Sequence, residues 1–141
     1  MSGVNTQLGA GDDNFSGTQF NDTISGGSGF DTLYGLGGAD RLFGEGTNDT
    51  IYGGTGNDSI NGGGQNDLLF GNEDNDSILG EGSEDTIVGG AGADYLAGGV
   101  VAPERSGRSG CQDGTDELPG RLVSQGAVGM DLVVVIEPGG E

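Results

Sequence analysis

Residues 53–61 read GGTGNDSIN, in which three glycines and a carboxylate, Asp58, come directly before a branched apolar residue, Ile60. Glycine loses more conformational freedom on ordering than any other residue, so this stretch by itself favours neither a helix nor an ordinary strand. The flanking sequence accounts for the pattern, because the same nine-residue unit continues on both sides without a gap.

Ten consecutive nonapeptides run from Leu8 to Ala97, and two of their positions are constant in character. The sixth position is always Asp: Asp13, Asp22, Asp31, Asp40, Asp49, Asp58, Asp67, Asp76, Asp85 and Asp94. The eighth is always large and apolar: Phe15, Ile24, Leu33, Leu42, Ile51, Ile60, Leu69, Ile78, Ile87 and Leu96. The first is Gly in every repeat except the one that begins at Leu8. A disordered tract has no reason to hold such a phase, so the sequence predicts a repeat architecture.

Composition alone would favour a disordered acidic segment. The chain is 31% hydrophobic, has 34 glycines and carries a net charge of −19, which is typical of such segments. The repeat overturns that reading. Nucleic acid is an unfavourable partner, since only 4 basic residues face 23 acidic ones. No apolar run approaches the roughly 20 residues of a membrane span, and the single Cys111 excludes an internal disulfide.

The nonapeptides resemble the calcium-binding repeat G-G-x-G-x-D-x-U-x of RTX (repeats-in-toxin) proteins, over residues 8–97. The resemblance implies an all-β fold, a right-handed parallel β-roll solenoid in which two nonapeptides form one turn, giving about five turns. The first six residues of each repeat are expected to form a turn and the last three a short strand. Residues 1–7 are then a lead-in, and residues 98–141 a degenerate tail or cap with one strand near 131–137.

Stacking in such a roll places residues that are 18 apart one above another, so the Asp residues of alternate repeats form two edges. Two carboxylates about 5 Å apart repel by roughly 3–4 kcal/mol at an effective dielectric constant near 20, and a divalent cation between them reverses the sign. Calcium suits carboxylate and carbonyl oxygens, whereas zinc prefers His or Cys, which the repeats lack, and magnesium demands a tighter shell.

The predicted metal ligands are the ten Asp residues given above, together with backbone carbonyl groups of the glycine-rich loops. These glycines are Gly9, Gly11, Gly26, Gly27, Gly29, Gly35, Gly37, Gly38, Gly53, Gly54, Gly56, Gly62, Gly63, Gly89, Gly90 and Gly92. Four gaps on each edge allow up to about eight internal calcium sites. The best sites are expected between Asp13 and Asp31 and between Asp40 and Asp58. Replaced glycines make the loops at Asp22, Asp49, Asp76 and Asp85 weaker candidates.

Position nine faces outward, and on one sheet it carries Tyr34, Tyr52 and Phe70 in consecutive turns. An exposed aromatic ladder of this kind is typical of a covered or binding surface. The sequence leaves three occupants open: the apolar segment Leu132–Ile136, a second copy in a self-association, or a polysaccharide or protein neighbour.

The chain has no His or Lys and no set of side chains arranged for catalysis, so the sequence predicts a non-catalytic module that folds on binding calcium. The resemblance implies a secreted bacterial protein, exported by a type I exporter without an N-terminal signal peptide. The alternatives are a C-terminal accessory module of a secreted hydrolase or polyuronate epimerase, and an adhesin segment.

Overall fold

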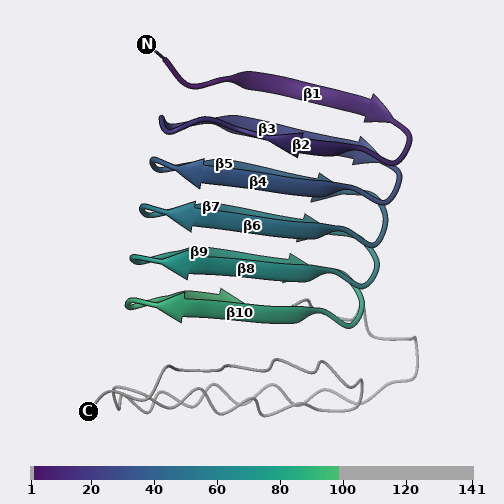
Figure 1. Cartoon of the computed structure of the whole chain (residues 1–141). Coiled ribbons are helices and arrows are strands. Elements are labelled where there is room, and N and C mark those ends of the chain that lie inside the picture. The colour runs from purple at the N-terminus through teal and green to yellow at the C-terminus, as the bar shows by residue number, and fades with distance from the viewer. Residues whose placement is uncertain (1, 99–141) are drawn as a thin grey trace, which may run out of the picture.

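The computed structural model describes residues 2–98, which form a flat stack of parallel strands (Figure 1). The strands are β1 (Asn5–Ala10), β2 (Asn14–Ser16), β3 (Thr23–Ser28), β4 (Thr32–Gly37), β5 (Arg41–Glu45), β6 (Thr50–Thr55), β7 (Ser59–Gly63), β8 (Leu68–Glu73), β9 (Ser77–Glu81), β10 (Thr86–Ala91) and β11 (Tyr95–Ala97). Each nonapeptide therefore contributes one strand, and the loops between strands lie along the two edges of the stack (Figure 1).

The strands form two parallel sheets in strict alternation. One sheet has the order β1-β3-β5-β7-β9-β11, and the other the order β10-β8-β6-β4-β2. Neighbouring strands pair with an offset of 18 residues, as in Leu33↔Ile51 and Ile60↔Ile78. The predicted all-β parallel β-roll, with two nonapeptides per turn, is confirmed.

The strands are longer than the three residues expected from the repeat. From β3 to β10 each has five or six residues and continues through the first two or three positions of the next nonapeptide. In each pairing that extends this far, the register skips the first-position residue and resumes at the second position, as in Gly27↔Glu45 and Gly54↔Asn72. At the other end, β1 begins at Asn5 and pairs with β3, so the roll starts inside the segment 1–7 that was expected to be a lead-in.

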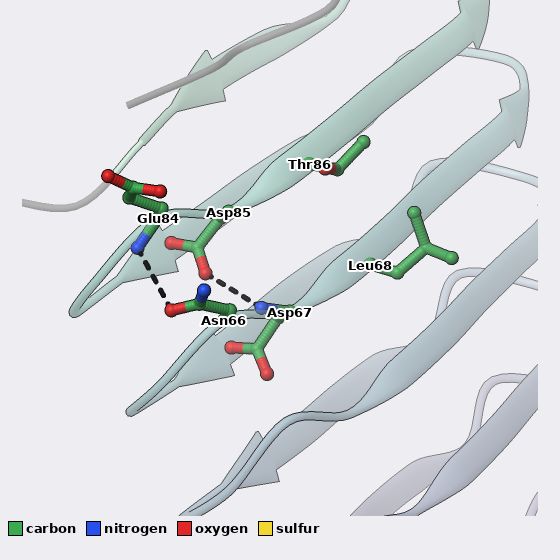
Figure 2. A pocket seen from close by; sticks show the side chains of 6 residues that line it. All are labelled: Asn66, Asp67, Leu68, Glu84, Asp85 and Thr86. Carbon is green, nitrogen blue, oxygen red and sulfur yellow. Dashed lines mark hydrogen bonds between the residues drawn. The ribbon is translucent and has the colours of Figure 1, made fainter. Parts of the chain in front are cut away.

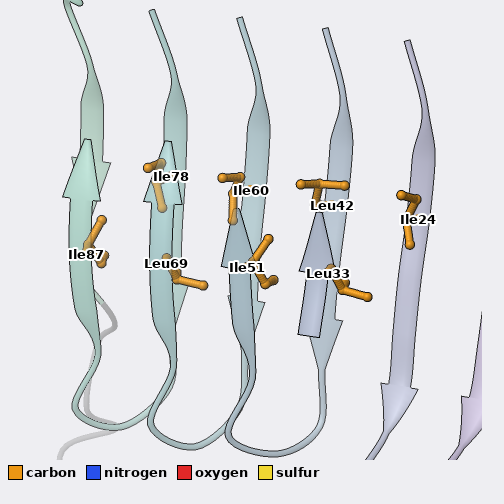
Figure 3. Packing of buried hydrophobic residues seen from close by; sticks show 8 residues of the cluster. All are labelled: Ile24, Leu33, Leu42, Ile51, Ile60, Leu69, Ile78 and Ile87. Carbon is orange, nitrogen blue, oxygen red and sulfur yellow. The ribbon is translucent and has the colours of Figure 1, made fainter. Parts of the chain in front are cut away.

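The core is one side chain thick and consists of the eighth position of each repeat (Figure 3). Eight of these residues are fully buried: Ile24, Leu33, Leu42, Ile51, Ile60, Leu69, Ile78 and Ile87. They come alternately from the two sheets and point into the space between them (Figure 3). Phe15 and Leu96, at the two ends of the series, are only partly buried and pack against this cluster. A single apolar residue per strand thus makes up the buried core between the two sheets.

The tail from residue 99 onward, with the strand predicted near 131–137, lies outside the described residues. Within residues 2–98 there is no helix of the length and hydrophobicity that a membrane crossing needs.

Candidate metal centre

The Asp residues of the sixth position are as inaccessible as the apolar core. Eight of them are only 1–3% exposed: Asp22, Asp31, Asp40, Asp49, Asp58, Asp67, Asp76 and Asp85. Asp13 and Asp94, in the first and last repeats, are partly buried. Charged carboxyl groups are almost never buried unless they are paired or bind a metal, so eight together require an explanation.

One carboxyl oxygen of the Asp residues from Asp31 to Asp94 is satisfied by the neighbouring turn. The Oδ1 atom of each accepts a hydrogen bond from the backbone N–H of the Asp that lies 18 residues earlier, as from Asp40 to Asp58 and from Asp58 to Asp76, both at 2.9 Å. The same bond joins Asp67 N–H to Asp85 Oδ1 on the opposite edge (Figure 2). The sequence correctly predicted that these residues stack in two series, but not that backbone N–H groups link them.

The other oxygen, Oδ2, has no hydrogen-bond partner at six buried positions within residues 2–98. These positions are Asp31, Asp40, Asp49, Asp58, Asp67 and Asp76. A buried polar atom without a partner costs free energy comparable to a lost hydrogen bond, and an isolated buried charge costs far more. These Oδ2 atoms are therefore candidates for binding a cation or a proton.

The first-position glycines wrap closely around these carboxyl groups. A Cβ atom on Gly53 would lie less than 3.0 Å from both Oδ2 of Asp58 and the carbonyl oxygen of Gly71, which is one turn further along. Gly35 bears the same relation to Asp40 and to the carbonyl oxygen of Gly53. A carboxylate oxygen and a backbone carbonyl oxygen thus converge beside each such glycine, in space that any side chain would fill.

The first-position glycines are not needed for an unusual backbone angle. None of them, Gly26, Gly35, Gly53, Gly62 and Gly89 included, has a positive φ. Glycine is required there because the carboxyl group leaves no room for a Cβ atom. The same contact identifies Gly17, Gly44, Gly71 and Gly80, which the sequence analysis did not select.

Positive φ angles occur instead at the second and fourth positions of the repeat. Of the glycines predicted as ligands, Gly9, Gly11, Gly27, Gly29, Gly38, Gly54, Gly56, Gly63, Gly90 and Gly92 are in this region, whereas Gly37 is not. Seven other residues keep the same conformation with φ between 74 and 85°: Leu36, Glu45, Gln65, Asn72, Asp74, Glu81 and Ser83. The loops that end at Asp76 and Asp85 therefore hold the common backbone shape without their glycines.

Some of the candidate carbonyl groups already accept hydrogen bonds from the next turn. The carbonyl oxygens of Gly27 and Gly63 accept from the N–H groups of Gly46 and Gly82, at 3.3 and 2.8 Å. The carbonyl oxygen of Gly29 accepts from the hydroxyl group of Thr47. These three oxygens already have a donor, which makes them less available to a metal.

Burial sets the protonation behaviour of the Asp series. It raises the pKa from the ordinary value of 3.8 to about 7 for Asp58 and Asp67 and to about 6 for Asp49 and Asp76, and it also raises the pKa of Asp31 and Asp40. The backbone N–H bond to Oδ1 lowers each pKa in part, and a neighbouring carboxylate raises it again. The fold alone thus shifts these groups toward the neutral acid, and a bound cation would shift them back toward the anion.

The geometry limits how a metal can be held. Among residues 2–98, no three Asp, Glu, His or Cys side chains come close enough together to bind an ion by themselves. A metal site in this region must combine the Asp oxygens with backbone carbonyl groups, and an all-oxygen set of this composition is the donor chemistry that calcium prefers. The unpartnered Oδ2 atoms and the converging carbonyl oxygens fit that requirement.

A further series of stacked side chains, at the fifth position of the repeat, was not predicted from the sequence. The side-chain oxygens of Asn21, Asn48, Asn57, Asn66 and Asn75 each accept a hydrogen bond from the backbone N–H one turn later. Figure 2 shows this bond between Asn66 and the N–H of Glu84, beside the Asp67–Asp85 bond in a shallow pocket at the edge of the roll. The recurrence of Asn directly before Asp was the available signal.

The comparison with protein families decides the relationship. The family model of the RTX calcium-binding nonapeptide repeat matches four times, at residues 8–42, 16–51, 43–78 and 70–100. The chain belongs to the RTX calcium-binding repeat family. Membership makes this RTX β-roll a calcium-binding module, in agreement with its donor set. No curated protein and no solved structure matches the chain.

Proposed function

We propose that this RTX β-roll is a calcium-dependent folding module with no catalytic role of its own. The observation that carries the proposal is the row of buried Asp Oδ2 atoms without a partner. A calcium ion supplies two positive charges and takes six to eight oxygen ligands. Its binding free energy becomes folding free energy, since the unfolded chain has no preformed site.

The residues of the chain have distinct parts in this process. The Asp residues of the sixth position provide the carboxylate ligands, and the first-position glycines leave space for carbonyl oxygens beside them. The backbone N–H bonds to Oδ1 fix the orientation of each carboxyl group, so that Oδ2 is the oxygen left for the ion. Without calcium, mutual repulsion within a chain of net charge −19 opposes the thin core.

The family and the charge together support an extracellular setting. RTX repeat proteins are typically secreted, and a chain that stays open at low calcium and folds at high calcium suits passage through a type I exporter. Residues 8–97 would then stabilise a larger secreted protein, for which a hydrolase, a polyuronate epimerase and an adhesin are the candidates.

Titration calorimetry tests the binding step. Calcium added to the full chain, after removal of metal by a chelator, should produce saturable heat with several ions bound per chain. Magnesium at the same concentration serves as the control for charge screening, and it should produce little heat because it retains its water shell. A chain that binds no calcium would contradict the proposal.

The outer face of the five-stranded sheet supports a second function, self-association. Tyr34, Tyr52 and Phe70 stack with ring centroids 5.0 and 4.8 Å apart and an interplanar angle of 4° for both pairs. The rings thus cover one another's faces, whereas a sugar packing on an aromatic residue needs a free face. This arrangement disfavours the polysaccharide alternative.

The distribution of charged residues on the two sheets also favours self-association. The strands of the five-stranded sheet contain one charged residue, Glu73 at the end of β8, whereas the six-stranded sheet contains Arg41, Glu45 and Glu81. In a chain of net charge −19, a nearly neutral face is where two copies repel each other least, and interface cores are depleted of charged residues. A second copy of this chain is therefore the proposed occupant.

Sedimentation of the full chain in calcium tests this function. The chain should associate, more strongly at high salt because salt screens the remaining repulsion. Changing Tyr34, Tyr52 and Phe70 to Ser should abolish association, whereas changing Phe43 and Leu79 on the opposite sheet to Ser should not. A wild-type chain that is monomeric at high salt would contradict self-association and leave the tail segment Leu132–Ile136 as the alternative cover.

A further inference from the structure

The loop at residues 17–22 differs from every other repeat loop that the structure describes. At the second position, nine of the ten repeats have a residue with positive φ: Gly9, Gly27, Leu36, Glu45, Gly54, Gly63, Asn72, Glu81 and Gly90. The tenth is Thr18, which is not in that region. Thr is β-branched and avoids positive φ, so a Thr at this position changes the path of the backbone.

The altered path turns hydrogen-bond donors of Thr18 toward the carboxyl group of Asp22. The backbone N–H of Thr18 donates to Oδ2 of Asp22 at 2.5 Å, and its hydroxyl group donates to Oδ1 at 3.0 Å. The same hydroxyl oxygen accepts a bond from the N–H of Phe20, which fixes its orientation. Oδ1 of Asp22 also accepts from the N–H of Val4 at 2.6 Å.

Asp22 is consequently the exception in the buried Asp series. It is as inaccessible as Asp40 and Asp58, at 1% exposed against 1 and 3%. Yet its Oδ2 atom has a donor, whereas the Oδ2 atoms of Asp40 and Asp58 on the same edge have none within the described part of the chain. Three donors on one carboxylate satisfy the buried anion without a metal.

We infer that the two donors of Thr18 take the place of calcium at Asp22, so that the N-terminal turn of the roll is closed by hydrogen bonds alone. The bond from Val4 to Oδ1 corresponds to the bond that the other buried Asp residues accept from the preceding turn. A calcium ion at Oδ2 would first have to displace the Thr18 N–H from its acceptor. The bond from Val4 also ties the residue before β1 to this turn, at the end of the solenoid where strand edges are otherwise exposed. The inference rests on the proposed calcium binding and concerns how the sites differ.

Replacement of Thr18 by Gly restores the residue type of the repeat and tests the inference directly. Thr18→Gly should allow the positive φ of the other loops, release Oδ2 of Asp22, and raise the calorimetric stoichiometry by one calcium ion per chain. Leu36→Gly is the matched control, because Leu36 occupies the same position of a repeat on the same edge and already has a φ of 80°. Its stoichiometry should equal that of the wild type.

A second variant keeps the test decisive if Thr18→Gly does not fold in calcium, as checked by circular dichroism. Asp22→Asn should leave the number of bound calcium ions unchanged, because the wild-type side chain binds none. An unchanged stoichiometry in Thr18→Gly, or the loss of an ion in Asp22→Asn, would overturn the inference. A wild-type chain that binds no calcium would instead overturn the proposed function itself.

Discussion

The loops at residues 17–22 and 53–58 occupy the same edge of the roll and the same phase of the repeat, yet they treat a buried carboxyl group differently. In the first, Thr18 and Val4 donate to both oxygens of Asp22. In the second, the N–H of Asp40 donates to Oδ1 of Asp58, and Oδ2 has no donor among residues 2–98. Equivalent places in the roll therefore hold one carboxyl group with donors on both oxygens and one with a donor on a single oxygen among residues 2–98.

The difference shows that the number of glycines in a loop does not by itself predict whether the Oδ2 atom of its Asp residue has a donor. Loops with Leu36, Asn72 or Glu81 at the second position keep the positive φ of the glycine loops and the same stacking of Asp residues. Only the β-branched Thr18 leaves that conformation at the second position. The φ angle at the second position, rather than the count of glycines, distinguishes the loop in which Oδ2 has a donor from those at Asp40 and Asp76, in which it has none within residues 2–98.

The largest effect is expected from removing the carboxylate of Asp58, in the loop at residues 53–58. Asp58→Asn should raise the calcium concentration at the folding midpoint by at least the 10–100-fold typical of losing a group that merely orients a metal ligand. Asp22→Asn should shift that midpoint by less than about threefold, because hydrogen bonds and not calcium hold this residue. Equal shifts in the two variants, measured by circular dichroism, would remove the distinction between the loops.

Closing the space beside the carboxyl group should be the next most damaging change. Gly53→Ala places a methyl group less than 3.0 Å from Oδ2 of Asp58 and should destabilise the calcium-loaded roll by about 1–3 kcal/mol in chemical denaturation. Gly46→Ala is the control, since the nearest atom to its Cβ would be the carbonyl oxygen of Gly27 at 3.5 Å. Similar destabilisation in both variants would mean that the Gly53 contact has no special role.

The pH dependence of folding tests whether protons and calcium compete for the buried Asp residues. Burial raises the pKa of Asp58 and Asp67 to about 7 in the folded state, against 3.8 for an ordinary Asp. Without calcium, this contribution to stability is fully present below about pH 4 and is lost as the pH rises through about 7. Because protons compete with calcium, the calcium midpoint should be higher at pH 5.5 than at pH 8. A midpoint that does not change would show that these groups do not exchange protons for calcium.

The smallest expected effect concerns the strain of the non-glycine loops. Leu36 is 42% exposed and has a φ of 80°, so Leu36→Gly should relieve strain and stabilise the roll by about 1 kcal/mol. Thr50→Gly, in the regular part of β6, should destabilise it by roughly the same amount. Denaturation in saturating calcium measures both, and destabilisation by Leu36→Gly would contradict the strain assigned to this position.

Much of this architecture follows from the sequence because it depends on period. The 18-residue stacking of Asp58 on Asp40 and the inward direction of Ile60 are consequences of two nonapeptides per turn. What the period could not reveal is which atoms remain without partners. That depends on local backbone geometry: the extension of strands through Gly53, the Asn66 bond to the next turn, and the turn of the Thr18 N–H toward Asp22.

Circular dichroism of the full chain, followed while calcium is raised from chelator to about 10 mM, tests the coupling of binding and folding most directly, since that range covers extracellular calcium-binding modules. The account predicts an unfolded spectrum in chelator and a cooperative gain of strand signal with calcium, but not with magnesium at equal concentration. A full strand signal in chelator, or no gain at any calcium concentration, would contradict it.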